Sequence, residues 1–450
     1  MKSIKRGERL TIIIIAAFLI GMIILVVKII MESSFYMSHS THVKLGNVYD
    51  CNGEILFDSE ASLEKYKDDA NYFIDIGNVI GDDSGQMTNT LVSENINKLQ
   101  NYNLLFGATK TGKSSIHATL NHAANRKVYE AFGNKDGTAI AYNYKTGEIL
   151  ICVSKPSVNI LNDENVSELP SGSLMCKAFY GTVPGSTQKV STLAAAIESI
   201  GYSAVSEKVY NCPGTYYNNY GTGIDCHDLS GHGVQNISQA LQNSCNPFFA
   251  QLVEELPLDG IINTFRDMGY SVNKSKNKEL EINGISIFRA STELTDVNDS
   301  ITQWGCIGQG KTEISPCQLM MWQSAIANGT DKVTMPYLID YSTNIIGITT
   351  HHSSTKYESA GFSSETSKHI REIMLENGRN NKYSSIGRSV GVKTGTAQVE
   401  NGKHENSLLV GFCDEDSLPI AFCIVIEKNE SQEMSTNQIA AQILNSLSES

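Results

Sequence analysis

The stretch Val183-Pro-Gly-Ser-Thr-Gln-Lys189, followed by the Ala-rich run Val190-Ser-Thr-Leu-Ala-Ala-Ala-Ile197, predicts a sharp turn into a helix. The Pro-Gly pair allows an abrupt entry, and a spacing of three residues stacks the amine of Lys189 over the hydroxyl of Ser186. A serine at a helix N-terminus also lies beside free backbone N–H groups, which suit an oxyanion. We therefore predict a serine nucleophile with a lysine base, as acyl transfer requires.

The Ser-x-x-Lys pattern is weak by itself, because it occurs five times in the chain. The other four copies, which start at Ser62, Ser271, Ser275 and Ser353, lie in charged and polar surroundings typical of a solvated surface. Lys-Thr-Gly also occurs three times, at residues 110, 145 and 393. The catalytic copies of the Ser-x-x-Lys and Lys-Thr-Gly motifs therefore have to be identified from their sequence context and their order along the chain.

An apolar segment near the N-terminus predicts a membrane anchor. From Leu10 to Val27 there are eighteen consecutive residues without a charge, which as a helix would span roughly 27 Å. No small-x-small cleavage site follows, which favours an uncleaved anchor at 10–31 over a signal peptide. Four basic residues precede the segment, so we expect a cytoplasmic tail at 1–9, a single pass through the cell membrane and an extracytoplasmic remainder.

The stretch Gly107-Ala-Thr-Lys-Thr-Gly-Lys-Ser114 matches a phosphate-binding P-loop letter for letter. A working P-loop also needs a helix directly after it and parallel βαβ units, and those units do not follow. The expected topology puts Lys113 outside the cell, where nucleoside triphosphates are scarce. We interpret the stretch as a turn that leads into residues 116–120.

Charge and cysteine content limit the partners and cofactors. The net charge of −13 argues against nucleic acid as a partner, because such binding depends on clustered Lys and Arg. The ten cysteines show neither a disulfide framework nor a CxxC pair for zinc, so we expect no metal site and no cofactor. Cys212 and Cys226 flank a Gly- and Tyr-rich loop, and the sequence leaves open whether they are paired.

The patterns of strands and helices divide residues 32–450 into two regions. Residues 32–115 are polar with short strand-like pieces, which predicts a small β-rich pedestal. Residues 116–450 show strands near both ends around a mostly helical stretch from about 186 to 330. The strands are expected at 138–144, 148–153, 390–396, 408–413 and 420–426, and a terminal helix at about 436–447. This pattern predicts an α/β domain of the α+β kind, in which one sheet is assembled from distant segments and a helical lobe is inserted.

Four longer motifs follow one another along the chain: VPGSTQK (183–189), HGVQNISQALQNSCNPFFAQL (232–252), IGQGKTEISPCQLMMWQSAIANG (307–329) and VGVKTGTAQ (390–398). With them the chain resembles the class B penicillin-binding proteins, the D,D-transpeptidases that cross-link peptidoglycan, over about residues 45–430. LGNVYDCNGEIL (45–56) and GTAIAYNYKTGEILICVSKPS (137–157) also resemble segments of that family. The resemblance implies the serine β-lactamase and penicillin-binding-protein fold, with an antiparallel sheet flanked by helices.

The resemblance also implies catalytic roles. Ser186 would attack the D-Ala-D-Ala carbonyl, and Lys189 would be its base. Ser244 of the Ser244-Cys-Asn246 motif would relay a proton to the leaving group. Asn246 would hydrogen-bond the substrate amide and help to place Lys189, and Lys393 would set the electrostatic field near Ser244.

The third motif implies the substrate contacts. Thr394, Gly395 and Thr396 would bind the substrate, with one of the two threonines on its terminal carboxylate. The backbone N–H groups of Ser186 and Thr396 would form the oxyanion hole, and the peptide would lie along this strand as an added strand. His232 and the turn Ile307-Gly-Gln-Gly310 match family motifs that we interpret as structural.

Three departures from the family pattern stand out: Cys51 in place of an arginine, Val392 in place of a small residue, and Glu405-Asn-Ser407 in place of a more aromatic run. The last two flank the expected substrate strand and put the peptide specificity in doubt. Two other interpretations stay open, namely a β-lactamase or β-lactam sensor, and a catalytically silent cell-wall scaffold. The resemblance implies stem peptides and β-lactam antibiotics as ligands, a carboxypeptidase side activity, and a polytopic glycosyltransferase of the SEDS family as partner. The sequence leaves open a role in elongation, division or sporulation.

Overall fold

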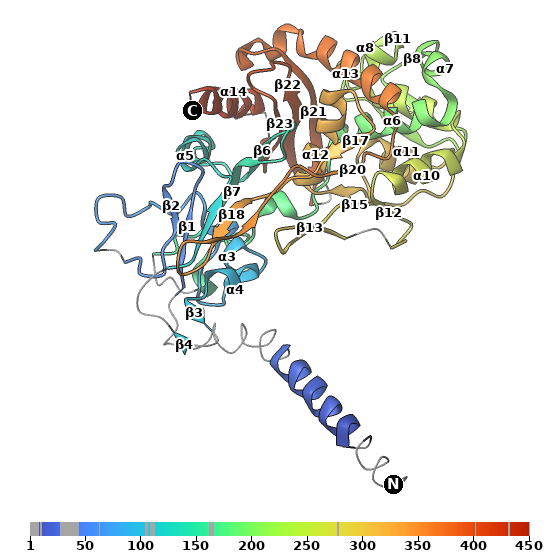
Figure 1. The fold of residues 1–450 in the computed structure, drawn as a ribbon. Helices are drawn as coiled ribbons and strands as arrows, with labels where there is room; N and C mark the ends of the chain where they lie inside the picture. The colour runs from blue at the N-terminus through green and yellow to red at the C-terminus, as the bar shows by residue number, and fades with distance from the viewer. Residues whose placement is uncertain are drawn as a thin grey trace.

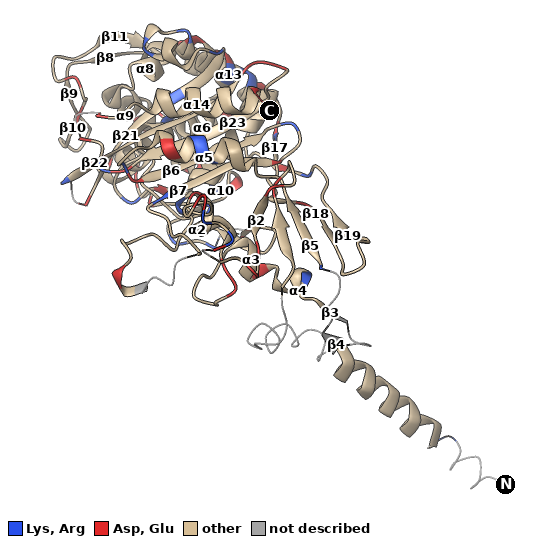
Figure 2. Ribbon diagram, turned by 90° about the vertical axis from the view of Figure 1, so that its left-hand side faces the viewer, with Lys and Arg blue, Asp and Glu red and all other residues tan. Residues whose placement is uncertain are grey.

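The structure is a computed structural model that describes residues 9, 11–27, 45–62, 64–103, 107–108, 113–161, 166–276, 279–400, 402–430 and 433–449. Residues 11–27 form a helix with exposed apolar side chains, which lies apart from the rest of the chain in Figures 1 and 2. Leu10 and residues 28–31 of the expected anchor lie outside the described residues, as do most of the tail and residues 32–44. In the described part of the chain, no helix has both the length and the apolarity to cross a membrane.

A five-stranded antiparallel sheet forms the centre of the large domain, in the order β21-β22-β23-β6-β7. Its strands are β6 (Gly137–Asn143), β7 (Ile149–Lys155), β21 (Val390–Val399), β22 (His404–Cys413) and β23 (Ile420–Ile426). The first two strands precede the helical lobe in sequence and the last three follow it, as the sequence predicts. The strand β21 is at an edge, paired with β22 from Val390 opposite Cys413 to Val399 opposite His404.

Helices cover both faces of this sheet. Alternate residues of β6 divide between two cores, because successive side chains of a strand point to opposite faces. Ala139 and Ala141 pack with α5 (His122–Ala131) and α14 (Thr436–Ser448). Ile140 and Tyr142 belong to the other core, which includes α12 (Pro316–Asn328). The burial of both faces explains why every residue of β23 is apolar and buried.

The helical lobe lies between β7 and β21 in sequence. Its helices are α6 (Gln188–Ile200), α7 (Tyr202–Ser206), α8 (Ile237–Gln242), α9 (Asn246–Glu254), α10 (Leu258–Asp267), α11 (Ser300–Ile307) and α13 (Ser364–Gly378), with short 3-10 turns η1 (Val166–Glu168), η2 (Lys177–Phe179), η3 (Gly185–Thr187) and η4 (Asn381–Ile386). Short strands join them: β8 (Val209–Cys212), β9 (Thr215–Tyr217), β10 (Gly223–Asp225), β11 (Gly233–Asn236), β12 (Tyr270–Val272), β13 (Leu280–Ile282), β14 (Ile285–Ile287), β15 (Ala290–Thr292), β16 (Glu313–Ile314), β17 (Lys332–Thr334) and β20 (Tyr357–Ser359). Helix α6 is buried over its first ten residues, so the lobe is built around it.

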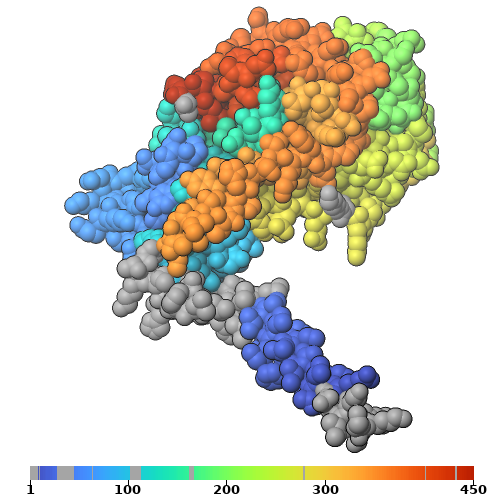
Figure 3. All heavy atoms as spheres, viewed as in Figure 1, coloured from blue at the N-terminus to red at the C-terminus, as the bar shows by residue number. Residues whose placement is uncertain are grey.

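A second sheet joins the N-terminal region to a distant hairpin. Its order is β19-β18-β5-β1-β2, with β1 (Asn47–Tyr49), β2 (Ile55–Phe57), β5 (Ser115–Ala118), β18 (Ile339–Thr343) and β19 (Thr349–His352). Across β1, β5 and β18, the rings of Tyr49, His117 and Tyr341 stack with centroids 5.2 and 4.1 Å apart. In Figure 3 the orange segment that includes β18 and β19 lies against the blue N-terminal part. The small sheet therefore combines strands from residues 47–118 with a hairpin from residues 339–352.

The remaining N-terminal elements are short: α2 (Gly77–Ile80), α3 (Leu91–Glu94), α4 (Ile96–Leu99), β3 (Tyr102–Asn103) and β4 (Gly107–Ala108). A buried carboxylate links this region to the large domain. Asp75 accepts hydrogen bonds from Asn125 Nδ2 at 2.9 Å, His122 Nε2 at 3.3 Å and Arg126 Nη1 at 3.5 Å, all on α5. Lys and Arg are scattered over the elements of both parts in Figure 2.

The P-loop-like stretch lies largely outside the described residues, since 109–112 are not described. The described part contradicts a P-loop, because residues 115–118 after it form strand β5 and not a helix. Lys113 forms an ion pair with Glu60 at 3.1 Å, and Ser114 Oγ donates to Leu99 O at 2.8 Å. The match to the phosphate-binding pattern is therefore a coincidence of composition.

Candidate active site

The nucleophile candidate lies at the turn predicted from its sequence. Ser186 is in η3, and α6 begins two residues later at Gln188. Gly185 has a φ of 52°, and a Cβ atom there would collide with the backbone oxygen of Thr396 on β21. A glycine is needed because the entry turn packs directly against the edge strand.

Lys189 is fully buried and faces this serine. Its Nζ lies 2.5 Å from Ser186 Oγ, and it also donates to Asn246 Oδ1 at 2.7 Å and to Ser244 O at 3.1 Å. Burial lowers the pKa of Lys189 to about 7, against a smaller raising effect of negative charge at the nearby Cys245 and Cys226 sulfurs. An amine that titrates near neutral pH can take up the proton of a hydroxyl.

The Ser-x-Asn motif occupies the turn between α8 and α9. Ser244 has a φ of 53°, a left-handed conformation that costs a serine about 1 to 3 kcal/mol. Asn246 is the first residue of α9, and its Nδ2 donates to Asp225 O at 2.8 Å. The surroundings therefore hold this turn in a conformation that serine does not prefer.

Lys393 approaches Ser244 from the sheet. It is buried on β21, and its Nζ donates to Ser244 Oγ at 2.9 Å and to Thr394 O at 2.6 Å. Burial, together with the charges of Lys189 and Lys382, moves the pKa of Lys393 well below its ordinary value. The two buried amines contact opposite ends of one residue, since Lys189 bonds the backbone oxygen of Ser244 and Lys393 its hydroxyl.

The predicted substrate contacts lie beside this pair on the edge strand. Thr396 is exposed and Thr394 is half-buried, whereas Gly395 is buried, with Pro184 O 2.9 Å from where its Cβ would be. The entry turn of α6 and the strand are thus in contact at Gly185 and Thr396. This contact brings the two backbone segments predicted to form the oxyanion hole side by side.

Two groups near the strand went unnoticed in the sequence. Tyr383 OH lies 3.4 Å from Thr394 Oγ1, and Asn377 Nδ2 donates to Val392 O at 2.8 Å. Neither residue lies in a recognisable motif, so no sequence signal pointed to them. The predicted structural turn at Ile307-Gly-Gln-Gly310 does lie at the site: Gly308 ends α11 against Gly185, and Gln309 Nε2 donates to Thr396 O at 3.4 Å.

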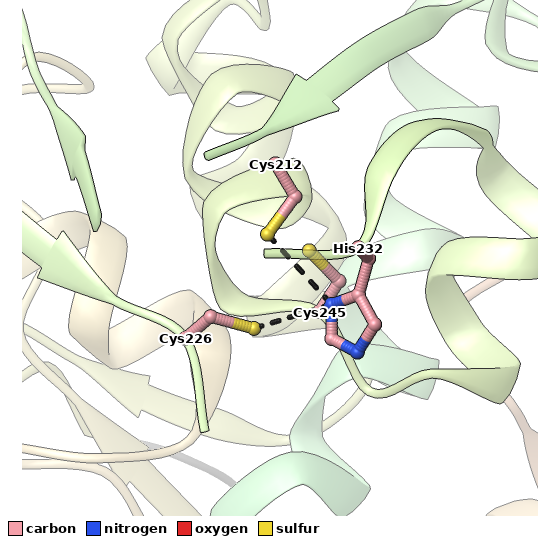
Figure 4. Close-up of side chains that lie close together, drawn as sticks. All are labelled: Cys212, Cys226, His232 and Cys245. Carbon is pink, nitrogen blue, oxygen red and sulfur yellow. Dashed lines mark hydrogen bonds between the residues drawn. The ribbon is translucent and has the colours of Figure 1, made fainter. Parts of the chain in front are cut away.

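A group of metal-ligating side chains lies directly behind the Ser-x-Asn motif. Cys212, Cys226, His232 and Cys245 have ligand atoms that all lie within 4.8 Å of one another, and Figure 4 shows them pointing toward a common centre. The expectation of no metal site did not anticipate this group, because its spacing, C-x13-C-x5-H-x12-C, matches no short zinc motif. Cys212 and Cys226 are free thiols and form no disulfide, and the other eight cysteines are free thiols as well.

A serine paired with a buried lysine, on an antiparallel sheet between helices, defines the class of serine acyl-transfer proteins that includes the serine β-lactamases and the penicillin-binding proteins. The chain belongs to the family of the penicillin-binding protein transpeptidase domain, which matches residues 137–449. This match confirms the family resemblance read from the sequence motifs.

Relatives of known name align with most of this chain. It is 30% identical over 329 residues to Stage V sporulation protein D of Bacillus subtilis, covering 71% of this chain and 49% of that protein. It is 24% identical over 349 residues to peptidoglycan D,D-transpeptidase MrdA of Acinetobacter baumannii, covering 70% and 51% respectively. The chain therefore spans about half the length of the curated relatives it matches.

Solved structures share the fold. The D,D-transpeptidase domain of a peptidoglycan glycosyltransferase from Eggerthella lenta has a TM-score of 0.72 at 20% identity, covering 91% of this chain and 99% of that one. The penicillin G acyl-enzyme complex of penicillin-binding protein A from Mycobacterium tuberculosis has a TM-score of 0.71 at 17% identity, covering 90% and 99%. These likenesses confirm the transpeptidase fold.

Proposed function

We propose that this protein is a peptidoglycan D,D-transpeptidase that cross-links stem peptides through an acyl-enzyme on Ser186. The observation that carries the proposal is the 2.5 Å separation of Ser186 Oγ and Lys189 Nζ, with a buried amine whose pKa is about 7. The names of two relatives, both peptidoglycan D,D-transpeptidases, support the substrate class. Ser186, Lys189, Ser244, Asn246 and Lys393 are all present in a chain that matches the family over residues 137–449, which supports catalysis over a silent scaffold.

In the acylation step, neutral Lys189 takes the proton of Ser186 while Oγ attacks the carbonyl carbon between the two D-alanines. The backbone N–H groups of Ser186 and Thr396 stabilise the oxyanion that forms. As the peptide bond breaks, Ser244 passes its hydroxyl proton to the departing D-alanine nitrogen and receives in turn the proton that Lys189 took from Ser186. The products are an ester on Ser186 and free D-alanine.

In the second step, an amine of a neighbouring stem peptide attacks this ester, and the same groups return the proton to Ser186. The donor peptide would pair with the free edge of β21, which supplies backbone groups from Lys393 to Ala397. Thr394 and Thr396 would receive its terminal carboxylate. Attack by water in place of the amine would give carboxypeptidase activity. The ratio of transpeptidase to carboxypeptidase activity therefore depends on how well the bound acceptor peptide excludes water.

The experiment that tests this proposal is acylation of the full-length protein, purified in detergent, by benzylpenicillin. Intact mass and peptide mapping should find one long-lived adduct on Ser186, and Ser186→Ala should abolish it. Ser62→Ala is the matched control, because Ser62 begins another Ser-x-x-Lys sequence on an exposed part of the pedestal. That variant should be acylated at the wild-type rate.

Other outcomes would decide between the remaining interpretations. An adduct on Ser186 that clears within seconds would identify a β-lactamase. A folded protein that forms no adduct, and that releases no D-alanine from a D-Ala-D-Ala stem peptide, would point to the silent scaffold. An adduct on a different serine would refute the assignment of the nucleophile.

We propose further that residues 10–31 anchor the protein in the cell membrane, with the catalytic domain outside. The proposal rests on the uncharged run from Leu10 to Val27 and the basic residues before it. Removal of residues 1–31 should release the protein from the membrane fraction at alkaline pH, whereas full-length protein should stay. Anchored in this way, the protein would assemble with a polytopic glycosyltransferase of the SEDS family, which co-purification from detergent extracts would test.

A further inference from the structure

The hairpin of β18 and β19 ends in a tight turn that presents isoleucines to solvent. The turn is Asn344-Ile-Ile-Gly-Ile348, and the side chains of Ile346 and Ile348 are 74% and 58% exposed. From Tyr341 to Thr355 there is no Asp, Glu, Lys or Arg, so two histidines are the only titratable side chains besides the tyrosine. Exposed apolar side chains that lie together, within an uncharged segment, mark a surface that contacts another molecule or a membrane.

A single asparagine holds this turn in shape. Asn344 Oδ1 accepts from the backbone N–H groups of Ile346 at 3.1 Å and Ile348 at 3.0 Å. The backbone oxygen of Asn344 accepts from Gly347 N at 2.9 Å, and its N–H donates to Ile348 O at 2.9 Å. Three consecutive N–H groups at the tip are thus paired within the turn. Backbone can enter an apolar medium only when its N–H groups are paired in this way.

The register of the small sheet determines where the turn projects. Asn47 at the start of β1 pairs with Ser115 at the start of β5, and Ser115 pairs with Thr343 at the end of β18. The hydroxyls of Ser115 and Thr343 are also hydrogen-bonded at 2.7 Å. The turn therefore lies at the same end of the sheet at which the chain enters β1. In Figures 1 and 2 the hairpin lies in the half of the folded part that is nearer to helix 11–27.

Chain length keeps this end of the sheet near the proposed membrane anchor. Leu45, just before β1, is the eighteenth residue after Val27, where helix 11–27 ends. A fully extended chain spans at most about 3.6 Å per residue, so the two residues are at most about 65 Å apart. With residues 10–31 in the membrane, the end of the sheet that carries the turn is the end tethered to the bilayer.

We propose that the tip of the β18–β19 hairpin inserts into the surface of the lipid bilayer, as a second membrane contact beside the anchor. Ile346 and Ile348 lie at the boundary between headgroups and acyl chains, where burial of their apolar surface stabilises the contact. Two isoleucines alone would bind a membrane weakly, but the anchor keeps the tip at a high effective concentration near the lipid. The contact requires the membrane anchor proposed above, and it is independent of the acyl-transfer chemistry.

A second contact would orient the catalytic domain relative to the membrane. The small sheet is joined to the central sheet, since Thr119, directly after β5, donates to Ile149 O of β7 at 2.7 Å. A single tether leaves the folded part free to rotate, whereas a tip held in the lipid restricts that rotation. The hairpin would therefore set the height above the membrane at which Ser186 meets its substrate.

The first test places a tryptophan at the tip of the full-length protein, held in lipid nanodiscs. Ile346→Trp should be quenched when the nanodisc lipids carry bromine on their acyl chains, because bromine quenches indole fluorescence only at short range. The matched control is Tyr217→Trp, at a side chain that is 68% exposed on β9, on the opposite side of the molecule in Figure 2. Its fluorescence should be the same in brominated and unbrominated lipid. The unaltered protein gives the background from the two native tryptophans.

Three outcomes of this test would overturn the lipid contact. The first is a tryptophan at position 346 that stays unquenched in nanodiscs that hold the protein. The second is protein that does not remain with the nanodiscs, which would refute the anchor on which the contact depends. The third is unquenched fluorescence together with a photo-cross-link from position 346 to another membrane protein, which would identify a protein partner instead of lipid.

A second test measures the orientation of the domain. A fluorescent penicillin on Ser186 is the energy-transfer donor, and dyes on the lipid headgroups are the acceptors. The double variant Ile346→Asp and Ile348→Asp should broaden the distribution of transfer efficiencies among single nanodiscs, because the anchor alone then restrains the domain. The control double variant Leu229→Asp and Val234→Asp alters side chains that are 71% and 70% exposed in the helical lobe.

The control should give the distribution of the unaltered protein. Identical distributions for all three proteins would overturn the proposed contact. If no form of the protein is acylated, the transpeptidase proposal fails, and the quenching measured at position 346 still decides the lipid contact.

Discussion

Acylation of Ser186 should depend on pH with a midpoint near the pKa of Lys189, which burial lowers to about 7. The neutral amine is the active form of the base, so the acylation rate should rise as pH rises. For a pKa of about 7, about one amine in eleven is neutral at pH 6 and about ten in eleven at pH 8. The second-order rate constant should therefore increase about tenfold between these two pH values.

The assay is stopped-flow or quenched acylation with excess benzylpenicillin, whose carboxylate stays ionised over this range. Circular dichroism at each pH would verify that the protein stays folded. Lys189→Met, whose unbranched side chain is one atom shorter and has no amine, should leave a slow residual rate that does not rise with pH. A rate that is flat between pH 6 and 8, or that falls as pH rises, would refute the assignment of Lys189 as the base.

Three further predictions follow from contacts described above. Lys189→Ala should lower the acylation rate by about 10²- to 10⁴-fold, the usual contribution of a positioned base, in the same assay with penicillin, and near-normal acylation would contradict the proposed mechanism. Gly185→Ala should lower the melting temperature and block acylation because its Cβ would collide with Thr396, whereas Gly310→Ala, which also has a positive φ but open space around it, should have a smaller effect on both. In urea titrations, Asp75→Ala should lower the free energy of unfolding by about 3 kcal/mol, because it leaves buried donors on α5 unpaired. The control Asp69→Ala removes a half-exposed partner of Arg126 at 3.6 Å. It should change the free energy of unfolding by less than about 1 kcal/mol.

Much of the large domain follows from local sequence pattern. The strands of the central sheet are apolar runs bounded by turn residues, and α14 shows clear helical spacing, so the sequence predicts these elements within a few residues. Ser186 and Lys189 were predicted from their spacing along one helix turn and from the Pro-Gly entry before it, whereas Ser244, Asn246 and Lys393 were assigned through the family resemblance. Ser186 and Lys189 are the clearest case, since a helix brings every third or fourth residue together.

The features that the sequence did not reveal depend on contacts between distant segments. Cys212, Cys226, His232 and Cys245 come from separate segments of the helical lobe, and their spacing along the chain has no helical or strand periodicity. Tyr383 approaches Thr394 only because η4 packs against β21. The pairing of β18 with β5 of the N-terminal sheet likewise depends on tertiary packing, since the pairing of short strands is determined by their neighbours in the fold more than by their own sequence.

The shared small sheet also determines how the chain can be divided. A cut between residues 115 and 116 would pass through strand β5, which pairs with β1 on one side and β18 on the other. A fragment that starts later would leave β18 and β19 as a two-stranded hairpin with an unpaired edge, the kind of surface that drives aggregation. The N-terminal region thus covers the edge of the hairpin, and a soluble catalytic fragment should keep both segments or lack both.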